Sequence, residues 1–437
     1  MIKILCKKIP TPLTAEDIFT TVFEDSKNRV WLDSSSHTIE GKNERQRFSI
    51  MADDLGEDAS IQHFSTGEIF NELNQKVPTH DVFVEHKDYE CSFQLGWIGW
   101  ISYEAEATFM HTDRALVLDH QTGDCFALFY NTQENTKWLM HVAQKISSVQ
   151  ETYLKHLGQA PVFRARDSKD SYLAKVEAIL EEIRQGNTYE ACLTTQLSAQ
   201  TPEDFTALDT YLALRHNNKA PYNAFIQLDG TTLMSTSPER FLGITAEGKI
   251  IAEPIKGTRK RAKDATEDLE HREDLYSSLK DRAENMMIVD LMRNDLSHFA
   301  VPGTIKVDRL FDIESYQSVH QMVSTISAQL RKSAQRGDVI QAAFPAGSMT
   351  GAPKIKTMEI LKELEAKPRG IYSGCLGFIS HNGAVELSVI IRTLIEHQGT
   401  LSLGVGGAVV ADSTPEAEYE EIQTKASGIL DTLGSTF

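Results

Sequence analysis

One lysine of the sequence stands in a setting that could make it a nucleophile. Lys256 belongs to the stretch Pro-Ile-Lys-Gly-Thr at 254–258 and is expected at a strand end, where Gly257 lets a ligand approach the backbone closely. A lysine in a dry site can lose its proton and attack an electrophilic carbon. The basic residues that follow are more typical of a solvated loop.

Glu239 is a candidate proton donor in the turn Ser-Pro-Glu-Arg-Phe at 237–241. A glutamate on a short turn beside a strand can act as a general acid if burial raises its pKa towards neutrality. An ordinary surface turn is the alternative, and the local pattern alone favours it.

Two acidic helices could share a divalent metal ion. A helix predicted over 269–296 projects Glu284 from an otherwise apolar stripe, and a second helix predicted from about residue 415 carries acidic residues and Lys425 at helical spacing. Mg²⁺ takes one or two carboxylates together with water and substrate oxygens. Ion pairs and ordinary surface glutamates are the alternatives. The candidate ligands are Asp281, Glu284, Glu418 and Glu421.

Glycine-rich stretches could also bring backbone N–H groups to a ligand. Residues 344–354 superficially resemble a phosphate loop, but the Gly-Lys-Ser/Thr of that motif is missing, so nucleotide binding is disfavoured. Gly404, Gly406 and Gly407 could donate to a carboxylate, and a tight crossing of strands is the alternative.

The elements that must position these residues are mostly strands. Such strands are predicted at 224–228, 249–252, 374–379, 385–391 and 401–410. Asp229-Gly230 and Asn382-Gly383 are typical of hairpin turns between them. A helix is predicted over 170–185, and the weak pattern of 151–166 indicates a linker between an N-terminal region, 1–165, and a C-terminal region, 166–437. The sequence therefore predicts an α+β protein with mainly antiparallel sheets covered by helices.

The bulk composition narrows the classes of partner. The chain has 437 residues and a net charge of −18, which argues against nucleic acid and against an anionic membrane surface, since both require a basic face. No apolar run reaches the roughly 20 residues that cross a bilayer. Five scattered cysteines without a C-x-x-C pair, and a start without a signal-peptide pattern, favour a reducing cytoplasm.

Taken together, these stretches resemble the chorismate-utilising enzymes, in which similar segments occur in the same order. The resemblance is strong over 166–437 and weaker before it. It includes anthranilate synthase component I and the isochorismate and salicylate synthases, and above all aminodeoxychorismate synthase component I. It implies the anthranilate synthase component I-like fold, in which two large stacked antiparallel sheets are flanked by helices and both regions form one intertwined unit.

The resemblance also implies a set of site residues for chorismate. Lys256 and Glu239 match catalytic positions, and Glu239 would protonate the departing C4 hydroxyl. Mg²⁺ would be held chiefly by Glu284 and Glu421, with Asp281 and Glu418 nearby. The positions that match substrate contacts are Gly257, Thr258, His320, Thr350, Tyr372, Arg392, Gly404, Gly406, Gly407 and Lys425. Chorismate carries two carboxylates and must lose hydroxide, so protonation and charge neutralisation are the help that it needs.

Lys256 decides which branch of the family the chain resembles most. Aminodeoxychorismate synthases have this lysine, which adds at C2 and expels the C4 hydroxyl before ammonia adds at C4. Anthranilate synthases, the alternative, usually have alanine there. Glu190 stands where the water-adding branch places a lysine base, which disfavours that branch; the role of Glu190 itself stays open. A catalytically silent chorismate- or tryptophan-binding subunit and a pyridoxal-phosphate enzyme are remoter alternatives.

Two further expectations follow from the resemblance. No glutaminase segment is recognised, which implies a separate glutamine amidotransferase subunit or the use of free ammonia, in the synthesis of para-aminobenzoate and folate. Asp33 and Ser34 lie in 30–34, which resembles the lining of a tryptophan pocket in relatives. An ordinary strand end is the alternative for these two residues.

Overall fold

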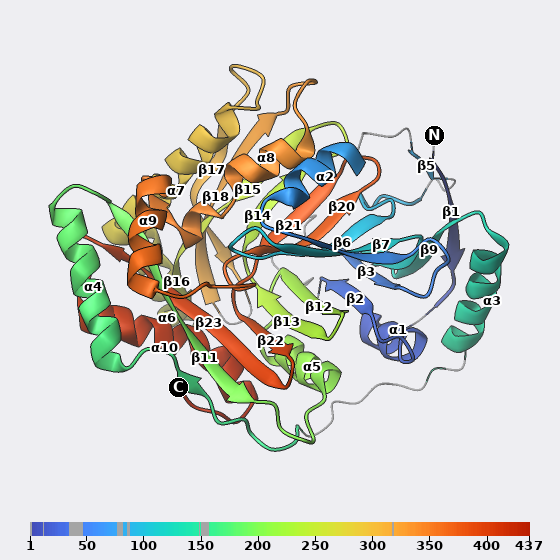
Figure 1. Ribbon diagram of the computed structural model, residues 1–437, viewed down its shortest axis with the longest axis horizontal. Coiled ribbons are helices and arrows are strands. Elements are labelled where there is room, and N and C mark those ends of the chain that lie inside the picture. Colours follow the sequence, from blue (N-terminus) through green and yellow to red (C-terminus); the bar gives the residue numbers. More distant parts are fainter. Residues whose placement is uncertain are drawn as a thin grey trace.

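Two large sheets organise the protein in the computed structural model (Figure 1). The structure describes residues 2–11, 13–34, 47–76, 82–84, 88–147, 149, 157–316 and 319–437, with the backbone alone at 2, 76 and 82–84. Part of the expected linker, 151–156, lies outside these residues. Within them every strand pairing is antiparallel except that of the first strand with the fifth.

The larger sheet contains strands from both ends of the chain. In spatial order these are β10 (Arg164–Ala165), β11 (Glu190–Gln200), β23 (Thr400–Val410), β22 (Thr393–His397), β13 (Thr231–Ser237), β12 (Tyr222–Leu228), β2 (Arg29–Asp33), β3 (Phe48–Asp53), β8 (Arg114–Asp119), β9 (Asp124–Tyr130), β1 (Ile2–Ile9) and β5 (Val82–Val84), with β19 (Gly351–Ala352) on β11. Because β2 pairs with β12, the sheet is continuous across residue 165.

The smaller sheet also joins the two regions, since β6 pairs with β20. In spatial order its strands are β16 (Ile255–Lys260), β18 (Val319–Gln329), β15 (Lys249–Glu253), β14 (Arg240–Ile244), β21 (Val385–Val389), β20 (Cys375–Ser380), β6 (Gly96–Ile101), β7 (Ala107–Thr112) and β4 (Ser60–Phe64), with β17 (Lys306–Ser315) on β18.

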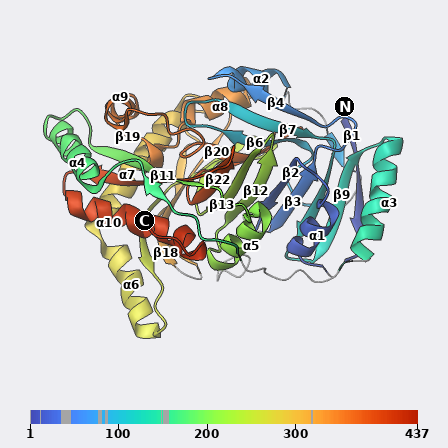
Figure 2. The same cartoon turned by 60° about the horizontal axis from the view of Figure 1, so that its bottom comes forward.

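Helices cover the outer faces of both sheets, and an apolar layer that includes Ile98, Ala224 and Leu376 fills the space between them (Figures 1 and 2). The larger sheet packs against α1 (Ala15–Val22), α3 (Gln133–Ser147), α4 (Lys169–Arg184), α5 (Ala207–Asn217) and α10 (Pro415–Thr432). The smaller sheet packs against α2 (Glu68–Lys76), α7 (Leu279–Ser297) and α8 (Arg336–Ala343). Two more helices, α6 (Ala265–Ser277) and α9 (Lys354–Glu365), contact β16 and β11 respectively.

This architecture confirms the predicted α+β class with two stacked antiparallel sheets. The hairpin at Asp229-Gly230 is also confirmed, and both of these residues have positive φ, as a tight turn of this kind requires. The single helix predicted over 269–296 is wrong, because the chain forms α6 and α7 instead. Ser278 leaves the helical conformation, with φ −62° and ψ 113°, and its hydroxyl accepts a hydrogen bond from the N–H of Asp281 to begin α7.

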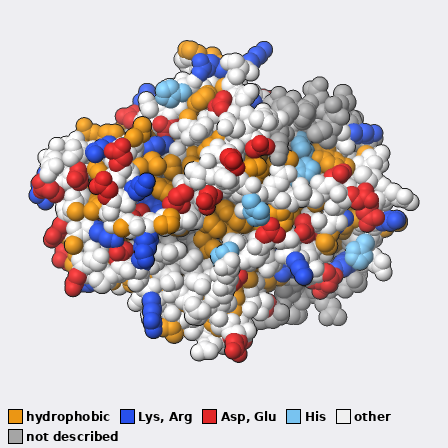
Figure 3. Space-filling model, viewed as in Figure 1, with side chains coloured by type: hydrophobic (Ala, Val, Ile, Leu, Met, Phe, Trp, Pro, Cys, Tyr) orange, Lys and Arg blue, Asp and Glu red, His pale blue; other side chains and the backbone are white. Residues whose placement is uncertain are grey.

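In the part of the chain that the structure describes, no helix combines the length and apolarity that crossing a bilayer demands. On the face drawn in Figure 3, Lys and Arg side chains are interspersed with Asp and Glu and form no continuous basic area.

Candidate active site

Lys256 is buried on β16 and forms an ion pair with Glu190 of β11. The pair therefore connects an edge strand of the smaller sheet with a strand of the larger one, at the end of the molecule where α10 lies. Burial lowers the pKa of Lys256, but the carboxylates of Glu190 and Glu284 outweigh it and leave the pKa above its ordinary value. Lys256 is thus held as an ammonium group.

Glu239 lies where the chain leaves β13 of one sheet and enters β14 of the other. Its backbone is fixed because its carbonyl accepts from the N–H of Val389, while the hydroxyl of Ser237 donates to the carbonyl of Val389. Burial raises the pKa of Glu239 to about 7, although nearby Ser348 and Lys256 act in the opposite direction. The side chain is therefore buried and able to keep its proton near neutral pH, as a general acid must.

Arg392 lies at another crossing between the sheets, between β21 and β22. Its carbonyl accepts from both the N–H and the hydroxyl of Thr236, which lies on β13 three residues before Glu239. Burial lowers the pKa of Arg392, and the charge of Glu239 partly offsets this. The structure therefore brings Glu239 and Arg392 together, as the sequence predicts.

Three carboxylates from two helices gather near Lys256. Lys280 Nζ lies 3.9 Å from Glu284 Oε1 on α7 and 3.7 Å from Glu418 Oε1 on α10. Burial raises the pKa of Glu284 to about 7 and also raises the pKa of Glu418. Burial also acts to raise the pKa of Glu421. The charge of Lys425, whose Nζ lies 2.6 Å from Glu421, outweighs burial and leaves the pKa of Glu421 below its ordinary value.

This group of carboxylates suits a magnesium ion that is completed by substrate. Among the residues that the structure describes, no three His, Cys, Asp or Glu side chains form a ready-made metal site. Mg²⁺, however, commonly takes only one or two carboxylates and keeps its remaining positions for water and substrate oxygens. Glu418 Oε2 is buried and has no hydrogen-bond partner in the described structure, and Glu284 is buried beside it. Both features favour a bound cation, so the donor set fits.

The glycines of β23 lie against the same site. A Cβ atom on Gly404 would come within 2.0 Å of the ring of Tyr372, so only glycine leaves room for this buried side chain. A Cβ atom on Gly407 would come within 2.9 Å of Glu418 Oε2. Lys425 Nζ donates to the carbonyl of Gly406 at 3.0 Å. The residues of β23, Tyr372 and the acidic helix α10 that are predicted to contact substrate or metal therefore lie close together.

Other predicted positions have different partners. Asp281 lies beside Gly257 but is paired with Arg259 at 3.0 Å, on the outside of the carboxylate group. The ring of His320 is buried between Asp268 Oδ1 at 3.1 Å and the hydroxyl of Ser315 at 2.8 Å. The roles proposed for both residues stay predictions.

Two threonines differ in exposure. Thr258 is exposed on β16, whereas Thr350 is fully buried and its hydroxyl donates to the carbonyls of Ala346 and Gly347. Thr350 also joins the site through its carbonyl, which accepts from the N–H of Cys192 on β11. Its contact with a substrate stays a prediction.

Comparison with known proteins matches the chain to one family. The family of chorismate binding enzymes matches residues 24–431. The chain belongs to this family. It is 36% identical to aminodeoxychorismate synthase from Streptomyces griseus, over 100% of this chain and 65% of that protein, and so spans less than two thirds of it. It is 39% identical to aminodeoxychorismate synthase component 1 from Escherichia coli, over 83% of this chain and 82% of the relative.

The fold of this chorismate binding enzyme agrees with a solved relative. The structure of anthranilate synthase component I from Streptococcus pneumoniae superposes with a TM-score of 0.76, at 23% identity, over 90% of this chain and 94% of that one. This likeness confirms the fold that the sequence resemblance implies.

Sequence patterns did not reveal the contacts of two side chains of the site. Glu190 is singled out in the sequence with its role left open, but its contact with Lys256 joins residues that are 66 positions apart. Lys280, which lies between Glu284 and Glu418, has the spacing of an ordinary helix-surface pair. The i to i+4 spacing from Lys280 to Glu284 was a visible signal, whereas no local pattern points from Glu190 to Lys256.

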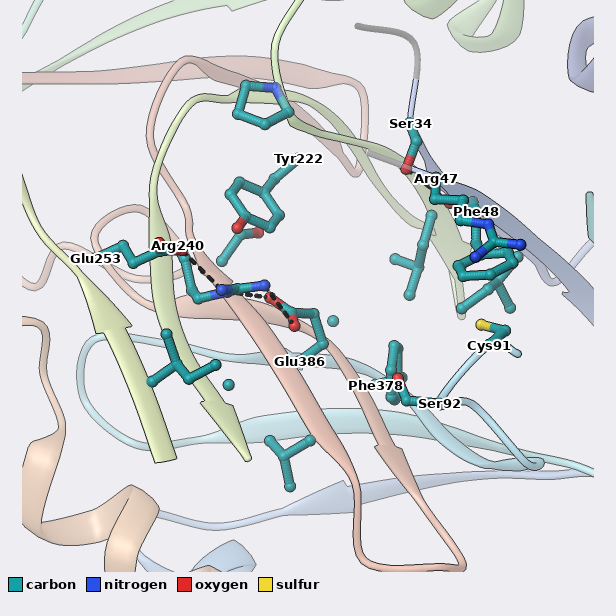
Figure 4. Close-up of a pocket in the computed structure, with 18 of the residues that line it drawn as sticks. Ser34, Arg47, Phe48, Cys91, Ser92, Tyr222, Arg240, Glu253, Phe378 and Glu386 are labelled. Atoms are coloured by element: carbon teal, nitrogen blue, oxygen red, sulfur yellow. Dashed lines mark hydrogen bonds and ion pairs between the residues drawn. The ribbon is translucent and has the colours of Figure 1, made fainter. Parts of the chain in front are cut away.

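Apart from this site, a cavity of about 1150 Å³ lies between the two sheets (Figure 4). Asp33 and Ser34 are among the residues that line it. The carboxylate of Asp33 is already engaged, since it accepts from Arg215 Nε at 2.6 Å and from the hydroxyl of Ser49 at 2.9 Å. The hydroxyl of Ser34 donates to the carbonyl of Phe48. The cavity stands where the sequence predicts a tryptophan pocket, and its occupant stays a prediction.

Proposed function

We propose that this chain converts chorismate and ammonia into 4-amino-4-deoxychorismate and water. The observation that carries the proposal is the buried Lys256, whose Nζ contacts Glu190 in the same site as Glu239 and Glu284. A buried amine is the group that a covalent adduct at C2 requires. Two relatives whose names are aminodeoxychorismate synthase, or its component 1, support the same activity.

The first part of the reaction is the loss of the C4 hydroxyl. Arg392, Tyr372 and the N–H groups of β23 bind and orient the substrate carboxylates, with Lys425 at the edge of the site. The amine of Lys256 forms a bond to C2, both double bonds of the ring shift towards C4, and the C4–O bond breaks. Glu239 gives its proton to the departing oxygen, which leaves as water.

The second part places nitrogen at C4. Ammonia forms a bond to C4, both double bonds shift back, and the C2–N bond to Lys256 breaks, so that the lysine is recovered. Thr350 and His320 contact the substrate in this proposal, with His320 beside the ring. Residues 1–165 and 166–437 act together because both sheets contain strands from each.

Glu284, Glu418 and Glu421 would hold the Mg²⁺ of this site, with Asp281 outside them. When bound, the ion supplies positive charge that neutralises the anionic substrate in an otherwise acidic site. We also propose that a glutamine amidotransferase subunit delivers the ammonia, in the cytoplasm.

The experiment that tests the function is identification of the product. Chorismate, ammonium and Mg²⁺ are incubated with the protein, with and without a glutaminase, and the products are separated and weighed by mass spectrometry. We expect 4-amino-4-deoxychorismate from the wild-type protein, and its loss in Lys256→Ala. Lys175→Ala is the control, because Lys175 also pairs with a buried carboxylate, at 2.6 Å from Asp167, but lies outside the site. Release of anthranilate and pyruvate would contradict the proposal.

A further inference from the structure

Glu190 is a fully buried carboxylate that the reaction outlined above does not use. Its side chain is 0% exposed on β11, and Oε1 accepts from Lys256 Nζ. Its second oxygen, Oε2, has no hydrogen-bond partner in the described structure. A buried carboxylate oxygen without a donor is costly unless a ligand supplies one. Glu190 therefore has one oxygen on Lys256 and a second oxygen that a bound ligand could meet.

Lys256 cannot attack C2 in the state in which the structure holds it. An ammonium group has no lone pair, and the carboxylates around Lys256 favour the ammonium form. The charged groups that face the pair are Glu284 of α7, Glu239 at the sheet crossing and Glu421 of α10. Of the side chains that the structure describes, Glu190 is the one whose oxygen contacts Nζ directly.

We propose that Glu190 is the base that deprotonates Lys256 for its attack on C2, a role that rests on the function proposed above. The N–H bond of the ammonium breaks and the proton passes to the Glu190 carboxylate, leaving a neutral amine beside a neutral carboxylic acid. Substrate that fills the site displaces water from it, and a dry environment favours the neutral pair over the ion pair. The lone pair on Nζ then forms the C2–N bond.

The proton returns to Lys256 at the end of the reaction. The C2–N bond breaks when ammonia has bonded to C4, and Lys256 leaves as a neutral amine. Glu190 then gives back the proton and the ion pair is restored. The proton that Glu239 gives to the departing oxygen is replaced from the ammonium group newly formed at C4. Chorismate and ammonia thus become 4-amino-4-deoxychorismate and water, and the protein is unchanged.

The test compares Glu190→Gln with the wild-type protein in a single turnover without ammonia. Glutamine still accepts a hydrogen bond from Lys256 but cannot take its proton. The protein is mixed with chorismate and Mg²⁺, and the covalent adduct on Lys256 is followed by intact mass. We expect the adduct to form about 100-fold more slowly at pH 7 in the variant. Asp167→Asn, which removes the buried carboxylate partner of Lys175, is the matched control and should form the adduct at the wild-type rate.

The pH dependence separates a proton acceptor from a structural contact. In Glu190→Gln the proton of Lys256 must go to solvent, so the deficit relative to the wild-type protein should shrink about tenfold for each unit of pH. Groups that titrate in both proteins change both rates equally, so they do not affect the ratio of the wild-type rate to the variant rate. Glu190→Asp, which restores a carboxylate, should recover part of the rate at pH 7.

The possible results are distinguishable. A deficit that stays constant with pH, or no deficit at all, overturns the role of Glu190 while leaving the proposed function standing if the wild-type protein makes 4-amino-4-deoxychorismate. A wild-type protein that forms no adduct and releases another product overturns both. If Glu190→Gln does not fold, Glu190→Ser replaces it in the same pH series: a deficit that shrinks as the pH rises supports the role of Glu190, and a constant deficit overturns it.

Discussion

Proton positions dominate the site at the scale of single residues. Glu239 and Glu284 are both buried carboxylates whose pKa is raised to about 7, while Lys256 is held as an ammonium. Burial acts alike on the two glutamates, but their neighbours differ: Glu239 faces Arg392, and Glu284 faces Lys280 and the acidic helix α10. Glu239 is therefore suited to donate a proton, and Glu284 is suited to bind a cation.

The raised pKa of Glu239 gives a prediction with a definite sign. In the proposed reaction Glu239 works in its protonated form, so the rate of C4–O cleavage should be level below about pH 7 and fall above it, about tenfold per pH unit. Glu239→Gln should lower the rate about 10² to 10⁴-fold and abolish the fall near pH 7. Single-turnover rates at about ten pH values between roughly 5.5 and 9 would measure this. A wild-type rate that still climbs above pH 8, about one unit past this pKa, contradicts the assignment.

At the scale of elements, local patterns predict what local forces decide. The hairpin turn at Asp229-Gly230 was predictable because positive φ restricts the residues that can stand there. The break at Ser278 was missed because both flanking segments favour a helix and a single hydroxyl decides the boundary. The contact of Glu190 with Lys256 was also out of reach, since it depends on how two sheets stack. The resemblance to a family, rather than periodicity, supplied Arg392 and Tyr372.

The boundary between α6 and α7 gives a prediction about stability. Ser278 ends α6 and its hydroxyl accepts from the N–H of Asp281 at 3.2 Å, so Ser278→Ala should cost about 1 kcal/mol in free energy of unfolding. Ser278→Asp should retain the stability, because aspartate caps equally well. The control is Ser277→Ala on the exposed side of α6, which should be nearly neutral. Urea midpoints would measure all three, and equal losses for Ser277→Ala and Ser278→Ala would count against the cap.

At the scale of the whole molecule, the active site and the inter-sheet cavity share the same strand segments. Glu239 belongs to the active site, and the next residue, Arg240, lines the cavity. Arg240 Nη1 donates to Glu253 at 2.7 Å, and its Nε donates to Glu386 at 2.7 Å (Figure 4). Glu253 in turn stands three residues before Lys256. One buried arginine therefore ties together three strands, β14, β15 and β21, close to Glu239 and Lys256 in the sequence.

Removal of this arginine should weaken the whole fold rather than one contact. Arg240→Met removes the nearer of the two arginines that pair with the buried carboxylate of Glu253, at 2.7 Å, and leaves it with Arg309 at 3.2 Å. The loss in free energy of unfolding should therefore exceed about 1 kcal/mol and stay below the roughly 3–5 kcal/mol of a fully broken buried pair. Arg309→Met is the matched control, because Arg309 also pairs with Glu253, at 3.2 Å, but is partly exposed and should cost about 1 kcal/mol or less. Guanidinium unfolding would measure both variants. Equal losses would mean that Arg240 contributes no more than a surface pair, and that the strands carrying Glu239 and Lys256 are held by packing alone.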